Sequence, residues 1–147
     1  MESDLNLVEQ LLLPFKIKEL FGYMDEYGKV VIAPIFVYAG LFNNGLAAVA
    51  RKGKVGYVNK SGEVMIPFDF DDAQEFQEGR AIVEINGLYG LIDRTGNYVL
   101  PPTFEDIGVI TQGVFYAIKE GKYRYYTVKG DDLFDIFFDD AYNFVDG

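Results

Sequence analysis

The chain has 147 residues, of which 50% are hydrophobic, and it contains neither histidine nor cysteine. This composition excludes thiol nucleophiles, imidazole bases, Ser–His and Cys–His catalytic pairs, and conventional zinc sites. The 23 acidic residues against 13 basic residues give a formal net charge of -10, which repels nucleic acids and anionic membranes. The length is sufficient to bury a core, so we expect a single domain after a short N-terminal cap.

The first 11 residues are predicted to form this cap as a short helix. Ser3 or Asp4 suits the N-terminal position of a helix, and the apolar residues that follow lie on one helical face. No basic stretch followed by an apolar run indicates a signal peptide, and no segment approaches the roughly 20 apolar residues of a membrane span. We therefore expect a cytoplasmic location, with which the absence of cysteine agrees.

Residues 12–147 form a tandem repeat with a period of 34 residues. Three registers that keep this period are Gly28, Gly62, Gly96 and Gly130; Gly45, Gly79, Gly113 and Gly147; and Phe36, Phe70, Phe104 and Phe138. The repeats are residues 12–45, 46–79, 80–113 and 114–147. A fixed period of this length is typical of proteins that stack identical supersecondary units.

Each repeat is predicted to contain about three short antiparallel strands and a loop. In the second repeat the strands are expected at 46–50, 55–59 and 63–66, where Pro67 ends the third, and small polar residues before glycine mark the turns. The following loop carries apolar residues at 70, 73 and 76, which we expect to pin it over the sheet. The fold class is therefore all-β, with the repeats in an open curved array or a small propeller-like arrangement.

The second repeat resembles the bacterial WG-repeat family, also called KWG repeats. The resemblance rests on Gly-Leu-Ala-Ala-Val, Gly-Lys-Val-Gly-Tyr-Val-Asn-Lys-Ser-Gly, Val-Met-Ile-Pro and Phe-Asp-Asp-Ala, and it covers residues 12–147. The Trp-Gly pair that names the family falls at Phe21-Gly22, Val55-Gly56, Tyr89-Gly90 and Tyr123-Arg124, so tryptophan is absent and the fourth repeat also lacks the glycine. The resemblance implies a binding or structural β module without established catalytic residues.

An acidic pair recurs at one register in the second, third and fourth repeats. Its members are Asp71, Asp72, Glu105, Asp106, Asp139 and Asp140. One interpretation is a row of carboxylates that binds Lys or Arg of a partner, or less readily a Ca²⁺ ion. The other is that the aspartates accept backbone N–H bonds and so cap the following turn. Both interpretations are compatible with the sequence.

Tyrosines are concentrated in the fourth repeat. In a β-strand Tyr123 and Tyr125 share one face, whereas Tyr126 takes the other. An exposed tyrosine face would suit a protein interface or a sugar platform, because aromatic groups provide contact area at low entropic cost. The alternative is that these rings belong to the core between repeats.

The sequence predicts a non-catalytic, cofactor-free module that binds another protein. No phosphate loop or dinucleotide motif is present, and we expect no enzymatic activity and no catalytic or metal site. The net charge favours a partner with a basic surface, as for an acidic immunity protein that neutralises a toxin. The alternatives are a module for carbohydrate or cell-envelope ligands that uses the tyrosine face, and a structural component of an assembly.

Overall fold

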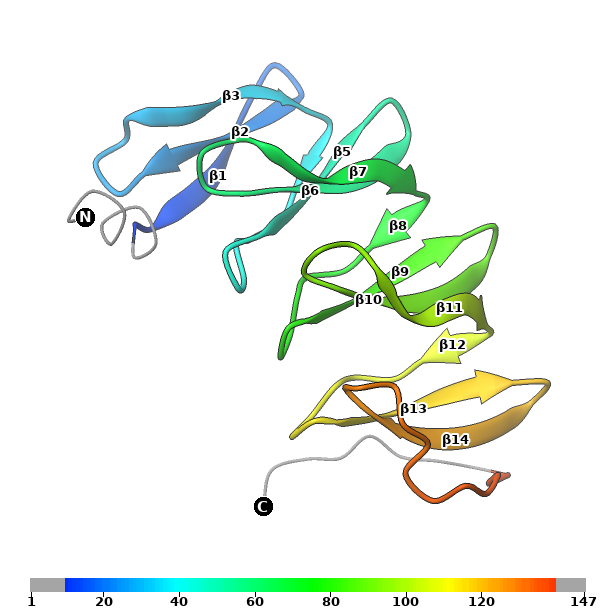
Figure 1. Ribbon diagram of the computed structural model, residues 1–147. Helices are drawn as coiled ribbons and strands as arrows, with labels where there is room; N and C mark the ends of the chain where they lie inside the picture. Colours follow the sequence, from blue (N-terminus) through cyan, green and yellow to red (C-terminus); the bar gives the residue numbers. More distant parts are fainter. Residues whose placement is uncertain (1–9, 140–147) are drawn as a thin grey trace. The chain divides into compact units, whose positions relative to one another are not determined.

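The computed structural model describes residues 10–139, which form 14 β-strands and contain no helix (Figure 1). The all-β prediction is therefore confirmed. The helical cap predicted for residues 1–11 is not supported: residues 1–9 lie outside the described part, and Gln10 and Leu11 precede β1 without helical structure.

The chain divides into two compact units, Met1–Glu75 and Phe76–Gly147. The strands of the first unit are β1 (Leu12–Ile17), β2 (Leu20–Asp25), β3 (Val30–Phe36), β4 (Tyr38–Ala39), β5 (Ala47–Arg51), β6 (Lys54–Val58), β7 (Val64–Phe70) and β8 (Asp72–Ala73). Those of the second are β9 (Arg80–Ile85), β10 (Leu88–Asp93), β11 (Tyr98–Phe104), β12 (Asp106–Ile107), β13 (Val114–Lys119) and β14 (Lys122–Thr127).

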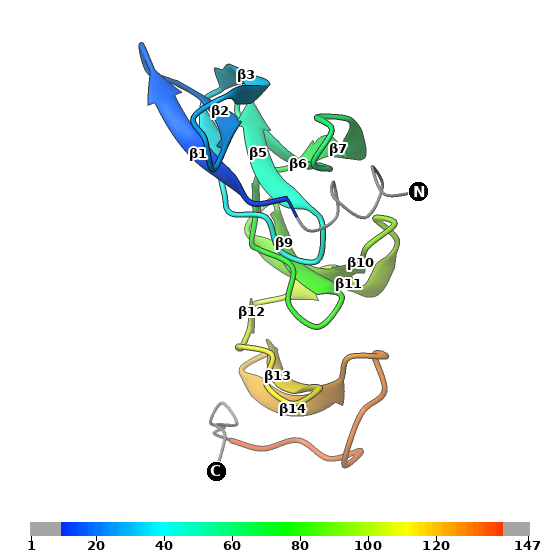
Figure 2. The same ribbon diagram turned by 90° about the vertical axis from the view of Figure 1, so that its left-hand side faces the viewer.

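Within each unit, consecutive strands pair as antiparallel meanders. The first unit holds β1-β2-β3 and β4-β5-β6-β7, and the second holds β11-β10-β9 and β12-β13-β14. Two-residue hairpin loops join the first two long strands of a repeat, as at Lys52-Gly53 between β5 and β6. Figure 2 shows β13 and β14 as a curved hairpin, as expected from the right-handed twist of strands.

The third long strand of the first three repeats carries a bulge that the sequence did not reveal. Val55 pairs with Phe70 and Tyr57 with Ile66, so the chain advances four residues along β7 against two along β6. The prediction that Pro67 ends this strand is wrong, because β7 continues through the proline to Phe70. The bulge accommodates a residue that has no N–H to donate to a sheet ladder.

The bulge passes directly over a glycine of the preceding strand. A Cβ placed on Gly56 would lie 2.7 Å from the carbonyl oxygen of Ile66, and one placed on Gly90 would lie 2.9 Å from that of Leu100. At Gly22 the corresponding distance, to Ile32, is 2.4 Å. The glycine of the Trp-Gly pair is thus required by the close approach of two backbones.

Each unit has its own hydrophobic core. Tyr23, Phe36 and Val49 lie in the core of the first unit, and Leu91, Phe104 and Phe115 in that of the second. Phe70, Ala73 and Phe76 are buried, as expected for apolar residues that hold this segment in place, but Phe70 ends β7 and Ala73 lies in β8 rather than in a loop.

A polar side chain caps the second hairpin of every repeat, at a register that sequence reasoning missed. The residues are Asp25, Asn59, Asp93 and Thr127, spaced by 34 residues. In each, one side-chain oxygen accepts the backbone amides two and four residues later; for Asp93 these are Thr95 N at 2.9 Å and Asn97 N at 3.1 Å. Such local bonds stabilise turns.

We expect Asp93→Asn to lower stability at neutral pH but not in acid. The hydrogen bond from the Thr95 hydroxyl, with the two amide bonds, holds the pKa of Asp93 below its ordinary value of 3.8. A lowered pKa means that the charged form stabilises the fold above pH 3.8, and that this contribution is lost as the pH falls through the lowered pKa. Asn59 already performs this role in the second repeat, so the variant should fold.

The measurement is urea unfolding of both proteins at stepwise lower pH, from neutral pH down to about pH 2. The difference in unfolding free energy between the two proteins should shrink as the pH falls below 3.8. Asp69→Asn removes the same charge from an exposed side chain and controls for net charge. A difference that stays constant over the whole pH range would contradict the prediction.

Candidate binding surfaces

The acidic pair lies at the surface in both compact units. Asp71 and Asp72 are exposed in the first unit, as are Glu105, Asp106 and Asp139 in the second, while Asp140 lies outside the described residues. The first members of two pairs form ion pairs with lysines 17 residues earlier: Asp71 with Lys54, and Asp139 with Lys122 at 2.7 Å. The hydrogen bond from Lys122 lowers the pKa of Asp139.

The second members of the pairs act as caps. Asp72 Oδ1 accepts the amide of Ala73, and Asp106 Oδ1 accepts the amide of Ile107, both at 2.9 Å. These bonds are of the kind that the capping interpretation requires. Because they need an acceptor oxygen and not a charge, an exposed carboxylate can also contribute its charge to a binding surface.

The register does not carry the same chemistry in every repeat. The first repeat has Val37 and Tyr38, both exposed, where the second has its acidic pair. In the third repeat Leu88 stands where Lys54 and Lys122 stand in their repeats, and Glu105 instead accepts the Gly121 amide at 3.3 Å.

The tyrosines of β14 alternate as predicted. Tyr126 packs on the core side against Phe115 and Phe104, with ring centroids 5.9 and 5.8 Å away. Tyr123 and Tyr125 are half-buried on the other face. Tyr123 contacts Tyr116 at 5.4 Å, and Tyr125 meets the edges of two phenylalanine rings, Phe134 at 5.9 Å and Phe138 at 5.5 Å.

The acidic register and the tyrosine face are neighbours in the second unit. Asp106 pairs with Ile118 of β13, and Tyr116 lies on the same strand. Burial, together with the negative charge of Asp106, raises the pKa of the Tyr116 hydroxyl, which therefore remains protonated at neutral pH. This part of the surface combines carboxylates with aromatic rings that can donate hydrogen bonds.

Arg124 forms the centre of a site that the sequence analysis did not identify. Its Nη1 donates to Asp132 and lies 3.7 Å from Asp135, and its guanidinium lies 3.7 Å from the ring centroid of Phe137. The hydrogen bond with Asp132 raises the pKa of Arg124. Burial alone would raise the pKa of Asp132, but the bonds from Arg124 and backbone amides hold it below its ordinary value. The sequence did carry one signal of this site, because Arg124 replaces the glycine that the other repeats have at this register.

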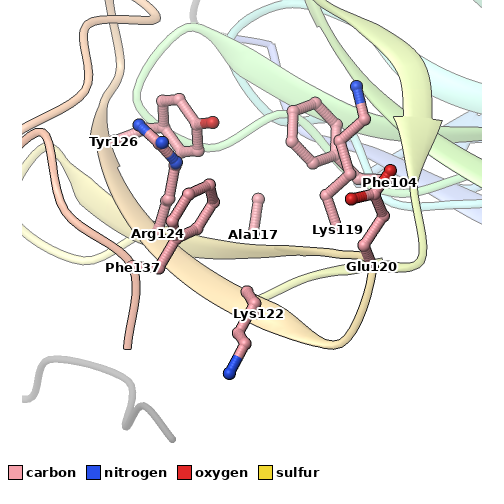
Figure 3. A pocket seen from close by; sticks show the side chains of 8 residues that line it. All are labelled: Phe104, Ala117, Lys119, Glu120, Lys122, Arg124, Tyr126 and Phe137. Carbon is pink, nitrogen blue, oxygen red and sulfur yellow. The ribbon is translucent and has the colours of Figure 1, made fainter. Parts of the chain in front are cut away.

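A pocket of about 260 Å³ adjoins Arg124 (Figure 3). It is lined by Phe104, Ala117, Lys119, Glu120, Lys122, Arg124, Tyr126 and Phe137. A second pocket, of about 360 Å³, is lined in the first unit by Arg51, Lys52, Lys54 and Phe68. Arg51, Lys52 and Lys54 stand two periods before Lys119, Glu120 and Lys122, so the same hairpin contributes to a pocket in two repeats.

Within residues 10–139, no group of three or more acidic, histidine or cysteine side chains is placed to hold a metal ion. In the same part of the chain, no helix is long and apolar enough to cross a membrane.

Comparison with known families agrees with the repeat architecture. No curated protein matches the chain in sequence. The family model described as "WG containing repeat" matches residues 21–54, 56–89 and 89–123, which together exceed half of the chain. The chain therefore belongs to the family of WG-containing repeat proteins.

Proposed function

We propose that the chain is a non-catalytic module that binds another protein through the acidic register, and that this partner has a basic surface. The observation that carries the proposal is the exposure of Asp71, Asp72, Glu105 and Asp106 in a protein of net charge -10. Carboxylates displayed at a repeated position favour rapid association with a cationic surface.

The finer form of the proposal is an immunity-type inhibitor in the cytoplasm. An acidic protein that covers the functional surface of a basic toxin needs no catalytic groups of its own. Surface charge pairs mainly accelerate association and are weakened by salt, so the affinity should fall as the ionic strength rises.

The test separates the charge of the register from its capping role. Asp72→Asn and Asp106→Asn remove charge but keep an oxygen that can accept the Ala73 and Ile107 amides. We expect the double variant to retain its unfolding free energy within about 0.5 kcal/mol, as surface substitutions usually do. We also expect it to bind its partner, captured by stoichiometric co-purification from the native host, about tenfold more weakly at low salt.

Asp72→Ala with Asp106→Ala is the matched comparison, because it removes charge and acceptor together. This variant should lose both affinity and about 1 kcal/mol of stability per site, as for other lost caps. If the Asn variant binds as tightly as the unmodified chain, the acidic register is a set of caps and the proposal fails. Capture of a partner without basic surface would refute the charge argument as well.

One observation favours a carbohydrate or cell-envelope ligand as the alternative. Tyr125 and Phe134 meet edge to face, and Phe134 is 50% exposed. Exposed aromatic rings are suitable platforms for sugars. Binding on a glycan array that Tyr125→Ala abolishes without loss of stability would support this function in place of protein binding.

A further inference from the structure

The fourth repeat replaces the required glycine by arginine and changes its third strand accordingly. Arg124 occupies the register of Gly22, Gly56 and Gly90. The segment that corresponds to the third strand still pairs with β14 at two points in the expected register: Tyr123 bridges Phe138, and Tyr126 bridges Asp132. Between these two bridges, no strand is formed, whereas β7 and β11 continue at the same place.

The physical reason is the close backbone crossing seen in the other repeats. A single Cβ at Gly56 already lies 2.7 Å from a carbonyl oxygen of the crossing strand, so a whole arginine side chain cannot fit beneath a bulge of that form. In the fourth repeat the residues between the two bridges are displaced, and Phe137 lies over the guanidinium, 3.7 Å away. Phe137 also lines the pocket of about 260 Å³, together with Phe104 and residues of the β13–β14 hairpin.

The pocket has two aromatic walls and a small apolar floor (Figure 3). Phe104 stands on one side and Phe137 on the other, with the methyl group of Ala117 between them. Tyr126, whose ring meets that of Phe104 edge to face with centroids 5.8 Å apart, also lines the pocket. The corresponding residues of the second and third repeats are Val49 and Val83, so the smaller alanine deepens the floor. The space between the walls suits a flat ring, which would gain contact with apolar side chains.

Positive charge is placed on both walls. The Lys119 ammonium lies 5.7 Å from the Phe104 ring centroid, and Arg124 lies against Phe137. Among the described residues, Asp132 and Asp135 are the acceptors of Arg124, and both contact its Nη1. A guanidinium has five N–H donors, so Nη2 and Nε can donate to a further acceptor. Lys122 lines the rim, but its ammonium points away in Figure 3 and pairs with Asp139.

From this arrangement we infer that the pocket of the fourth repeat binds a small aromatic carboxylate. The ring enters between Phe104 and Phe137 above Ala117, the carboxylate accepts hydrogen bonds from Arg124, and the Lys119 ammonium beside Phe104 adds positive charge to the pocket. Hydrogen bonds between a guanidinium and a carboxylate are stronger than neutral ones, particularly beside apolar walls. Glu120 at the rim disfavours ligands with several negative charges, so a single carboxylate fits best.

The size of the pocket argues for a small molecule. Pockets for drug-sized ligands span about 300–1,000 Å³, and 260 Å³ lies just below this range. A ligand with a single ring and a short acidic arm has about ten non-hydrogen atoms. Ligands of this size reach dissociation constants on the order of 1 mM or tighter, given the usual free energy per atom.

The test is a titration of the full chain with phenylacetate, followed by amide chemical shifts in NMR spectra. We expect saturable shifts at residues of β13 and β14, and weaker binding by at least about tenfold for acetate, which lacks the ring, and for phenethylamine, which carries the opposite charge. Equal binding of phenylacetate and phenethylamine, or no saturable shift at millimolar concentrations, would overturn the inference.

Two substitutions locate the site. Ala117→Val installs the residue of the second and third repeats and should fill the floor without preventing folding, while Arg124→Gln removes the carboxylate donor. Each should weaken phenylacetate binding at least about tenfold, the usual effect of losing one charged hydrogen bond or a close packing contact. Arg94→Gln removes an arginine from an exposed turn of the same unit and should leave binding unchanged. Saturable binding that survives both site variants would refute the assignment.

Discussion

Gly56→Ala is expected to destabilise the protein by about 3 kcal/mol, the upper range for an overpacked site. The added Cβ would lie 2.7 Å from the Ile66 carbonyl oxygen and 3.0 Å from Phe68 N and Pro67 C. All three are backbone atoms of the β7 bulge, so no side-chain rotation relieves the contact. Either β7 must move from β6, or the buried residues around it must repack.

Urea unfolding of the full chain, followed by circular dichroism, measures the effect. The matched control is Gly53→Ala in the hairpin between β5 and β6. Gly53 has a φ of 80° and nothing within 4 Å of its ideal Cβ, so alanine there suffers only left-handed backbone strain, about 1–2 kcal/mol. If the two variants lose the same stability, the backbone crossing is not what requires glycine at position 56.

The same contrast explains which parts of the fold could be predicted from sequence. Every repeat must place a turn, a strand and a buried ring at equivalent points, so Phe36, Phe70 and Phe104 keep their spacing and all three are buried. The ends of the strands were harder to predict from the sequence. Pro67 normally terminates a strand, and only the passage of β7 over Gly56 shows why this one continues.

The candidate surfaces divide in a similar way. The acidic register could be recognised in the sequence from its regular spacing. Its capping bonds, such as the one that Asp72 accepts from the Ala73 amide, depend on local geometry. The pairing of Lys54 with Asp71 joins residues 17 apart, half of the repeat period, and recurs at Lys122 and Asp139. The signal for the Arg124 pocket was a departure from the pattern, and departures become informative only once the role of the normal residue is known.

Tyr57→Ala is expected to cost about 4 kcal/mol, as for other large buried rings. The Tyr57 side chain is fully buried, and its hydroxyl donates to the Gln74 carbonyl oxygen at 2.6 Å. Burial above all, and then the negative charge of Asp72, raises the pKa of this hydroxyl, which stays protonated as the bond requires. Tyr23 makes the same bond to the Gly40 carbonyl in the first repeat, at 2.7 Å.

Tyr57→Phe separates the ring from the hydroxyl. The ring should account for most of the loss, and the phenylalanine variant should cost about 1 kcal/mol, because only the part-buried hydrogen bond to the Gln74 carbonyl is lost. The third repeat shows that this register can be filled without a hydroxyl, since Leu91 stands there and is fully buried.

The hydroxyl also holds the loop that carries the acidic pair Asp71 and Asp72. Hydrogen exchange of the amides at 71–75 should therefore accelerate in Tyr57→Phe more than exchange in β5 and β6 does. If the acidic register is the binding surface, loss of this bond should lower the affinity for the partner even where the protein remains folded, because an ordered loop loses less entropy on binding. Unchanged exchange at 71–75 would show that the buried Ala73 side chain, and not the Tyr57 hydroxyl, positions the loop.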